Sequence, residues 1–234
     1  MTGSRTDDCI VRPLRFTDDI PVMRGFLELL GMAPRVEAQG GGWVDMVSGA
    51  GMLALHEAAS SSTSGRPGQT NLSFEGVDLD ALAARLTDAG WSDATIWDEA
   101  YGRVLSVTDP SGVPIWVDGY SDDDYGYRVH VPDRDRRWSV MPVRSTANVE
   151  EYARFLGRFG LPDAGGDAPT LGGHVGLVRV ESGPETVRLG FATEEPLDDV
   201  ATRLRAAGHD PTVAGRQLTV VDPDGQPVVV NARP

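Results

Sequence analysis

Three short patterns recur in the same order in the two halves of this chain, and this internal repeat constrains the fold more than any other feature. The first is a strand-like run followed by an amphipathic segment that ends in glycine, at residues 14–31 and 143–160. The second is a strand followed by a helix with an acidic start and an Ala-Gly end, at residues 72–90 and 189–208. The third is a hairpin turn before a strand, Asp-Pro-Ser-Gly at 109–112 and Asp-Pro-Asp-Gly at 222–225. The repeat predicts two similar domains joined in one chain.

The spacing between equivalent features falls along the chain, from 129 residues for Phe26 and Phe155 to 113 for Asp109 and Asp222. The second copy is therefore about 16 residues shorter, mostly between its first helix and its middle strand, and we leave open whether a strand is missing there. We predict domain 1 over residues 9–119, a solvated acidic and charged linker over 120–137, and domain 2 over 138–234.

Residues 43–47 and 52–56 alternate polar and apolar side chains with a period of two, which is typical of half-buried strands. This alternation predicts that Trp43, Asp45 and His56 lie on the sheet face away from the helices. In the first strand, polarity favours Leu14 and Phe16 under the helix and Arg15 on the opposite face.

Composition excludes several classes of partner. The 21 basic residues, all arginine, stand against 35 acidic ones, which gives a formal charge of −14. Because nucleic-acid and membrane-surface binding draw on basic patches, we expect neither partner. Cys9 is the single cysteine, which excludes an internal disulfide and a thiolate metal cluster. With no signal-peptide pattern in residues 1–10 and no membrane-spanning run, a cytoplasmic location is expected.

The strand-helix-strand order, residues 26–31 after Asp18-Asp19, and the Asp109-Pro110-Ser111-Gly112 turn resemble the vicinal oxygen chelate superfamily. That superfamily includes glyoxalases, bleomycin-resistance proteins and extradiol dioxygenases. The resemblance covers residues 10–119 and 138–231. It implies an α+β fold of two tandem domains, each built from paired βαβββ modules that form a cup-shaped mixed sheet.

In metal-dependent members of the superfamily, His and Glu side chains hold a divalent ion in the cup. The resemblance maps these ligand positions onto Val11 or Arg12, Asn71 and Trp116 in domain 1, and onto Val140 or Met141, Arg188 and Val229 in domain 2. None of these side chains is a good metal ligand. We therefore expect no metal and no other cofactor, and the chain is more similar to the bleomycin-resistance type, which sequesters a small molecule.

The candidate ligand-binding residues are those expected in the domain 1 cup. Trp43 and Trp116 offer flat aromatic area for an aromatic or cationic ligand, and Arg15 could clamp a carboxylate or phosphate. The full set is Arg15, Trp43, Asp45, His56, Asn71, Ser73 and Trp116. No catalytic residue is assigned. We expect the chain to sequester a small organic ligand, an antibiotic or another cationic or aromatic compound. A monomer suffices for this, and a homodimer is compatible with it.

Two other interpretations stay open. The first is a lyase, isomerase or cyclase that acts in the same cup through His56, Asp45 or an arginine, either metal-free or with a metal at a displaced site. Such an enzyme should need a polar pair within about 3 Å at the cup floor. The second is a regulatory or scaffold protein that uses residues 120–127 of the acidic linker as a docking segment.

Overall fold

A computed structural model describes residues 9–61, 64–99, 102–121, 125–166 and 168–233. The beginning of the chain, the middle of the Ser-rich stretch at 60–65 and the acidic run at 122–124 lie outside the described residues. Within the described part, no helix is both long and apolar enough to span a bilayer.

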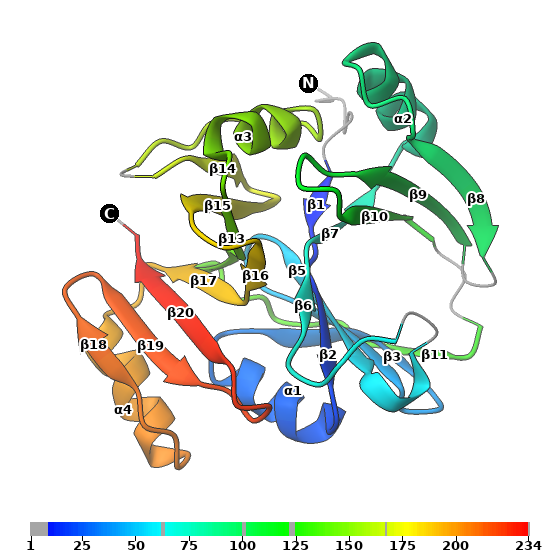
Figure 1. Ribbon diagram of the computed structural model, residues 1–234. Helices are drawn as coiled ribbons and strands as arrows, with labels where there is room; N and C mark the ends of the chain where they lie inside the picture. Colours follow the sequence, from blue (N-terminus) through cyan, green and yellow to red (C-terminus); the bar gives the residue numbers. More distant parts are fainter. Residues whose placement is uncertain (1–8, 62–63, 100–101, 122–124, 167, 234) are drawn as a thin grey trace, which may run out of the picture.

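Four modules follow one another along the chain, each a strand, a helix and further strands (Figure 1). Module 1 comprises β2 (Leu14–Thr17), α1 (Ile20–Glu28), β3 (Ala33–Ala38), β4 (Trp43–Val47) and β5 (Met52–Glu57), followed by the short helix η1 (Ala58–Ser60). Module 2 comprises β7 (Ser73–Gly76), α2 (Leu79–Asp88), β8 (Thr95–Glu99), β9 (Gly102–Thr108) and β10 (Pro114–Gly119). Module 3 comprises β13 (Val143–Thr146), α3 (Val149–Gly157), β14 (Thr170–Gly173) and β15 (Gly176–Ser182). Module 4 comprises β17 (Gly190–Thr193), α4 (Leu197–Ala206), β18 (Thr212–Ala214), β19 (Gln217–Val221) and β20 (Pro227–Ala232).

Module 3 has two strands after its helix where the other modules have three, within the described residues. The structure thus answers the question left open for the shortened second copy. In each module the first strand pairs in parallel with the last, as β2 does with β5 and β13 with β15.

Short strands join the modules in pairs. β1 (Ile10–Val11) pairs with β7, and β6 (Thr70–Asn71) pairs with β2, so modules 1 and 2 form one unit. β12 (Trp138–Val140) pairs with β17, and β16 (Thr186–Arg188) pairs with β13, so modules 3 and 4 form the second unit. The result is an α+β molecule with four curved sheets and helices on one face of each, which is the predicted fold class.

Side-chain caps explain where three of the helices begin. Asp19 accepts a hydrogen bond from the backbone N–H of Val22 at 3.0 Å, and Asp78 does the same for Ala81 at 2.9 Å. Asn148 caps the third helix from the equivalent position. These caps satisfy N–H groups that have no partner inside the helix, and each stabilises its helix by about 1 kcal/mol.

The helices meet between the two units. The Phe26 ring of α1 lies 5.0 Å from His209, which follows α4, and Trp91, which follows α2, lies 5.1 Å from Phe155 of α3. One continuous apolar core therefore runs through both domains. Gly51 and Gly176 approach each other so closely at the β4–β5 and β14–β15 turns that a Cβ on either would clash, and both have a positive φ.

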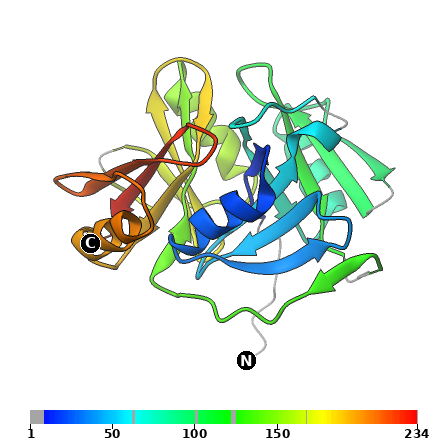
Figure 2. The same ribbon diagram turned by 90° about the horizontal axis from the view of Figure 1, so that it is seen from below.

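Most described residues between the domains are exposed, and three of them form a strand. Tyr127–Val129 forms β11, which pairs antiparallel with β3 and extends the module 1 sheet. Figure 2 shows the green chain after β11 running along one side of the molecule toward the second domain. The Arg residues at 134, 136 and 137 follow this strand.

The orientation predicted for the first strand was wrong. Leu14 and Phe16 pack with Ala54 on the face away from α1, next to Trp43. Arg15 lies on the opposite face, where its guanidinium bonds Asp222 and Asp224 of domain 2 and Thr70. All four residues of β2 are buried, so polarity could not distinguish its two faces. Burial raises the pKa of Asp222, and the Arg15 charge opposes that rise.

Candidate functional site

The alternation of side chains along the short strands β1 and β12 and along the β7–β10 pair determines which side chains face the two cups. Val11 and Val140 pack in the continuous core, so their neighbours Arg12 and Met141 point to the opposite face. In domain 1 the cross-strand pairs Trp116 with Ser73 and Asp118 with Glu75 lie on that same cup face, because Ile115, Val117 and Phe74 fill the core side.

A network of ions forms the floor of the domain 1 cup. The Arg12 Nε atom donates to Asp45 Oδ1 at 2.8 Å, and its Nη1 donates to Asp118 Oδ2 at 2.5 Å. Only 6% of the Arg12 side chain is exposed. Burial by itself lowers the pKa of Arg12, but Asp45, Asp118 and Glu75 outweigh it and raise that pKa, so the guanidinium stays charged.

Arg35 on β3 is the second cation of this network. Its Nη2 donates to Asp45 Oδ2 at 3.1 Å and to Glu75 Oε2 at 2.8 Å. The Arg35 Nε atom is buried and has no hydrogen-bond partner. In the described part of the chain, the hydrogen bonds of Glu75 and Asp118 each engage one carboxylate oxygen, so the second oxygen of each can meet a ligand.

Aromatic rings line the wall beside this floor. The Arg12 guanidinium lies 5.2 Å from the centre of the Trp43 ring, and the His56 ring meets the Trp43 ring edge-on at 5.4 Å. Phe16 lies 5.8 Å from His56 on its other side. The Nδ1 atom of His56 lies 2.8 Å from the backbone carbonyl of Glu57. Because a carbonyl only accepts, Nδ1 carries the hydrogen, and Nε2 of neutral His56 has the lone pair.

The structure brings six of the seven predicted site residues to the cup side of domain 1. Trp43, Asp45 and His56 share a face, and Ser73 donates to the Arg12 carbonyl at 2.6 Å. Trp116 is partly buried beside Ser73. Asn71 lies opposite Leu14 on the neighbouring strand, so the two side chains share the cup face. The amide oxygen of Asn71 accepts a hydrogen bond from Gln69 at 2.9 Å. Arg15 does not face the cup.

Four members of the ion network were missing from the predicted site: Arg12, Arg35, Glu75 and Asp118. Two of them carried a usable signal, because Glu75 and Asp118 follow Ser73 and Trp116 by two residues and so share their face. For Arg12, the sequence resemblance indicates only a metal-ligand position that an arginine does not fill. Nothing local marks Arg35, whose partners lie 10 and 40 residues along the chain.

The positions expected to ligate a metal hold residues that do not fit one. In domain 1, Arg12 presents a cation, and Trp116 offers no ligand atom. In domain 2, Met141 packs with Leu177 and Ala192, and Val229 is buried. Among the residues that the structure describes, no group of three or more His, Cys, Asp or Glu side chains is arranged to hold a metal ion.

Comparisons with known proteins identify the fold through solved structures and not through sequence. No protein-family model and no curated protein sequence matches the chain. Among solved structures, the Mn(II)-bound glyoxalase of Novosphingobium aromaticivorans aligns with a TM-score of 0.61 and 18% identity, covering 97% of this chain and 82% of that one. The 2,2',3-trihydroxybiphenyl 1,2-dioxygenase of Sphingomonas wittichii aligns with a TM-score of 0.62 and 14% identity, covering 97% and 90%. The homoprotocatechuate 2,3-dioxygenase of Arthrobacter globiformis aligns with a TM-score of 0.58 and 17% identity, covering 100% and 83%. The chain therefore has the vicinal oxygen chelate fold in its tandem form, as the sequence resemblance implied.

Proposed function

We propose that this protein binds a small organic molecule in the domain 1 cup without a metal ion, and that the ligand combines an aromatic ring with a cationic group. The observation that carries the proposal is the Arg12 network, in which a guanidinium occupies an expected metal-ligand position and pairs with Asp45 and Asp118. The positive charge of Arg12 neutralises two carboxylates of the cup, and these carboxylates are then not available as ligands for a divalent ion.

The walls and the floor of the cup support a ligand of this kind. Trp43, Trp116 and His56 provide ring faces and edges against which an aromatic ring can pack. The floor carries three carboxylates, Asp45, Glu75 and Asp118, against two guanidinium groups, so its net charge is negative. An ammonium or guanidinium group of the ligand would meet the outer oxygens of Glu75 and Asp118, and the acidic surface of the whole chain would attract it.

The test uses 2-phenylethylamine as an aromatic cation and phenylacetate as its anionic counterpart, measured by quenching of tryptophan fluorescence and by calorimetry. We expect the amine to bind and the acid to bind at least tenfold more weakly. Trp116→Ala should weaken amine binding about tenfold or more, because it removes a ring that can pack on the ligand. Trp91→Phe, an aromatic replacement at the domain interface, is the matched control and should bind normally. Equal binding of the two probes, or full binding by Trp116→Ala, would overturn the proposal.

A lyase or isomerase activity in the same cup is the second candidate, and one observation favours it. The contact of His56 Nδ1 with the Glu57 carbonyl leaves the Nε2 lone pair of the neutral ring as a proton acceptor beside Trp43. The polar pair at the cup floor, Arg12 and Asp45, is a closed ion pair and not an acid and base in contact. Under this candidate, His56→Gln would abolish turnover of a bound ligand while its binding persists.

A further inference from the structure

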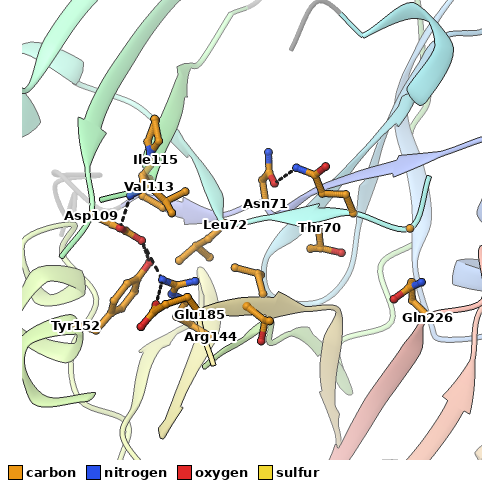
Figure 3. Close-up of a pocket in the computed structure, with 15 residues that line it drawn as sticks. Thr70, Asn71, Leu72, Asp109, Val113, Ile115, Arg144, Tyr152, Glu185 and Gln226 are labelled. Atoms are coloured by element: carbon orange, nitrogen blue, oxygen red, sulfur yellow. Dashed lines mark hydrogen bonds and ion pairs between the residues drawn. The ribbon is translucent and has the colours of Figure 1, made fainter. Parts of the chain in front are cut away.

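A pocket of about 360 Å³ lies between the two domains, and Asn71 is the one predicted cup residue in its lining. It opens between β6 of domain 1 and β16 of domain 2, which occupy equivalent places in the repeat. In Figure 3, Asp109, Arg144, Tyr152 and Glu185 gather at one end of this pocket, and Gln226 lies at the other end. The volume is in the range of pockets that bind small molecules.

Arg144 leaves a buried hydrogen-bond donor without a partner at this pocket. The side chain is 3% exposed, and its guanidinium lies 4.7 Å from the centre of the Tyr152 ring. Its Nη2 donates to Glu185 and Ser111. The Nε atom has no hydrogen-bond partner. A buried donor without a partner is unfavourable, so an acceptor oxygen supplied by a ligand beside this guanidinium would be favoured.

The carboxylates of the pocket are already occupied by donors of the protein. Asp109 Oδ1 accepts from the backbone N–H groups of Ser111 and Val113, and its Oδ2 accepts from the Tyr152 hydroxyl at 2.8 Å. Burial, followed by the Asp109 charge, raises the pKa of Tyr152 and keeps this phenol protonated. Glu185 accepts from Thr146, from the Ala147 N–H and from Arg144.

This arrangement disfavours both kinds of ionic ligand. Two carboxylates surround one guanidinium, so an anion that approached Arg144 would also meet Asp109 and Glu185. A cation would have to compete with the donors that already bond every carboxylate oxygen of these two residues. An uncharged ligand with oxygen acceptors and hydroxyl donors avoids both costs.

The rest of the lining fits such a ligand. Thr70, Thr186 and Gln226 bring neutral polar side chains from both domains, and Leu72 and Val187 provide apolar contact area. We propose that the interdomain pocket binds a small uncharged polyhydroxylated molecule, a monosaccharide or a cyclic polyol, with one of its oxygens accepting a hydrogen bond from the Arg144 guanidinium. Such a ligand would bridge the two domains.

Saturation-transfer NMR on the full chain tests this, with D-glucose and myo-inositol as probes and D-gluconate and D-glucosamine as charged controls. We expect transfer to at least one neutral probe and at least tenfold weaker transfer to the charged sugars. Thr186→Phe places a ring in the mouth of the pocket at an exposed strand position and should reduce the signal at least tenfold. Thr212→Phe, at an exposed position of β18, is the matched control and should keep it.

Absence of transfer to both neutral probes would overturn the proposal, as would stronger transfer to a charged sugar. Full binding by Thr186→Phe would place the ligand elsewhere and overturn it equally. Gln226→Ala is a second variant that adds no bulk to the pocket. It should weaken binding several-fold, because Gln226 lines the end of the pocket opposite Arg144 and its amide is lost. These outcomes are independent of the domain 1 cup, since Thr186→Phe should leave fluorescence quenching by 2-phenylethylamine unchanged.

Discussion

The cups of the two domains share a backbone register and differ in chemistry. β7 and β10 pair in domain 1 as β17 and β20 do in domain 2, so residues at matched positions can be compared directly. The matched pairs are Arg12 and Met141, Glu75 and Ala192, Asp118 and Asn231, and Trp116 and Val229. At these matched positions the floor of the first cup is ionic and the floor of the second is uncharged, whereas the ion pair of the second cup, Arg188 with Glu181, lies on its module 3 wall.

This difference shows that the fold does not need ions at the cup floor. Removing charges from water is costly, and buried ion pairs can often be replaced by apolar side chains without loss of stability. Domain 2 shows such a replacement, because Met141 packs with Leu177 and Ala192 where domain 1 has its ion network. This contrast supports the proposal that Arg12, Asp45, Glu75 and Asp118 serve ligand recognition in domain 1.

The largest expected effect comes from giving domain 1 the residue of domain 2. Arg12→Met should lower the free energy of unfolding by about 3–5 kcal/mol, because Asp45 and Asp118 then lose a buried partner. Denaturant unfolding followed by circular dichroism measures the loss. Met141→Leu, a volume-conserving change at the matched position, should cost less than about 1.5 kcal/mol. A loss below about 1 kcal/mol for Arg12→Met would show that the carboxylates do not depend on Arg12.

The next effect concerns ligand affinity. Asp118→Asn copies the matched Asn231 and removes one negative charge from the cup floor. We expect it to weaken 2-phenylethylamine binding about tenfold, or about 1.4 kcal/mol, and to strengthen phenylacetate binding, because the floor loses a negative charge. Calorimetry on both probes measures the ratio. Asp80→Asn, which removes an exposed carboxylate of α2, is the control for net charge and should leave the ratio unchanged.

A smaller effect is expected on the pH dependence of stability, and it arises from an ion pair on the helix side of domain 2, away from the cup ions. Hydrogen bonds from Arg203 lower the pKa of Glu195 below its ordinary 4.5, although burial opposes this, and Trp138 donates to the same carboxylate at 3.1 Å. Since the folded-state pKa is lowered, the stabilisation is present above about pH 4.5 and is lost as the pH falls through the folded value. The stability difference between the parent and Glu195→Gln should therefore shrink below pH 4.5, as measured by urea unfolding from pH 7 to pH 3. A constant difference would contradict the assignment.

Much of this architecture was predictable, because the repeat and the period-two strands are local patterns. They indicated the paired modules, the shortened second copy and the cup face that carries Trp43, Asp45 and His56. The errors arose where the deciding partner is distant in sequence. Arg15 is buried because Asp222, 207 residues away, neutralises it across the domain interface. Arg12 likewise pairs with Asp118, 106 residues away, so the local pattern could place Asp118 on the cup face but could not show that it pairs with Arg12.

The smallest expected effect is the response to metal ions. In the domain 1 cup, both oxygens of Asp45 and one oxygen each of Glu75 and Asp118 already accept from Arg12 or Arg35. A divalent ion at the two remaining oxygens would be repelled by both guanidinium groups, so tight binding would require one of them to move away. A tight ion at one hundred times its Kd would stabilise the fold by about 2.7 kcal/mol, which corresponds to a rise of about 5–10 °C in Tm. We expect Mn²⁺, Ni²⁺ and Zn²⁺ added after EDTA treatment to change Tm by less than about 1 °C, with Ca²⁺ as the baseline for weak surface binding. A rise of several degrees with one of the three ions alone would mean that the network opens to admit a metal. The difference between the two cup floors would then be the presence of a metal site in domain 1 and its absence in domain 2.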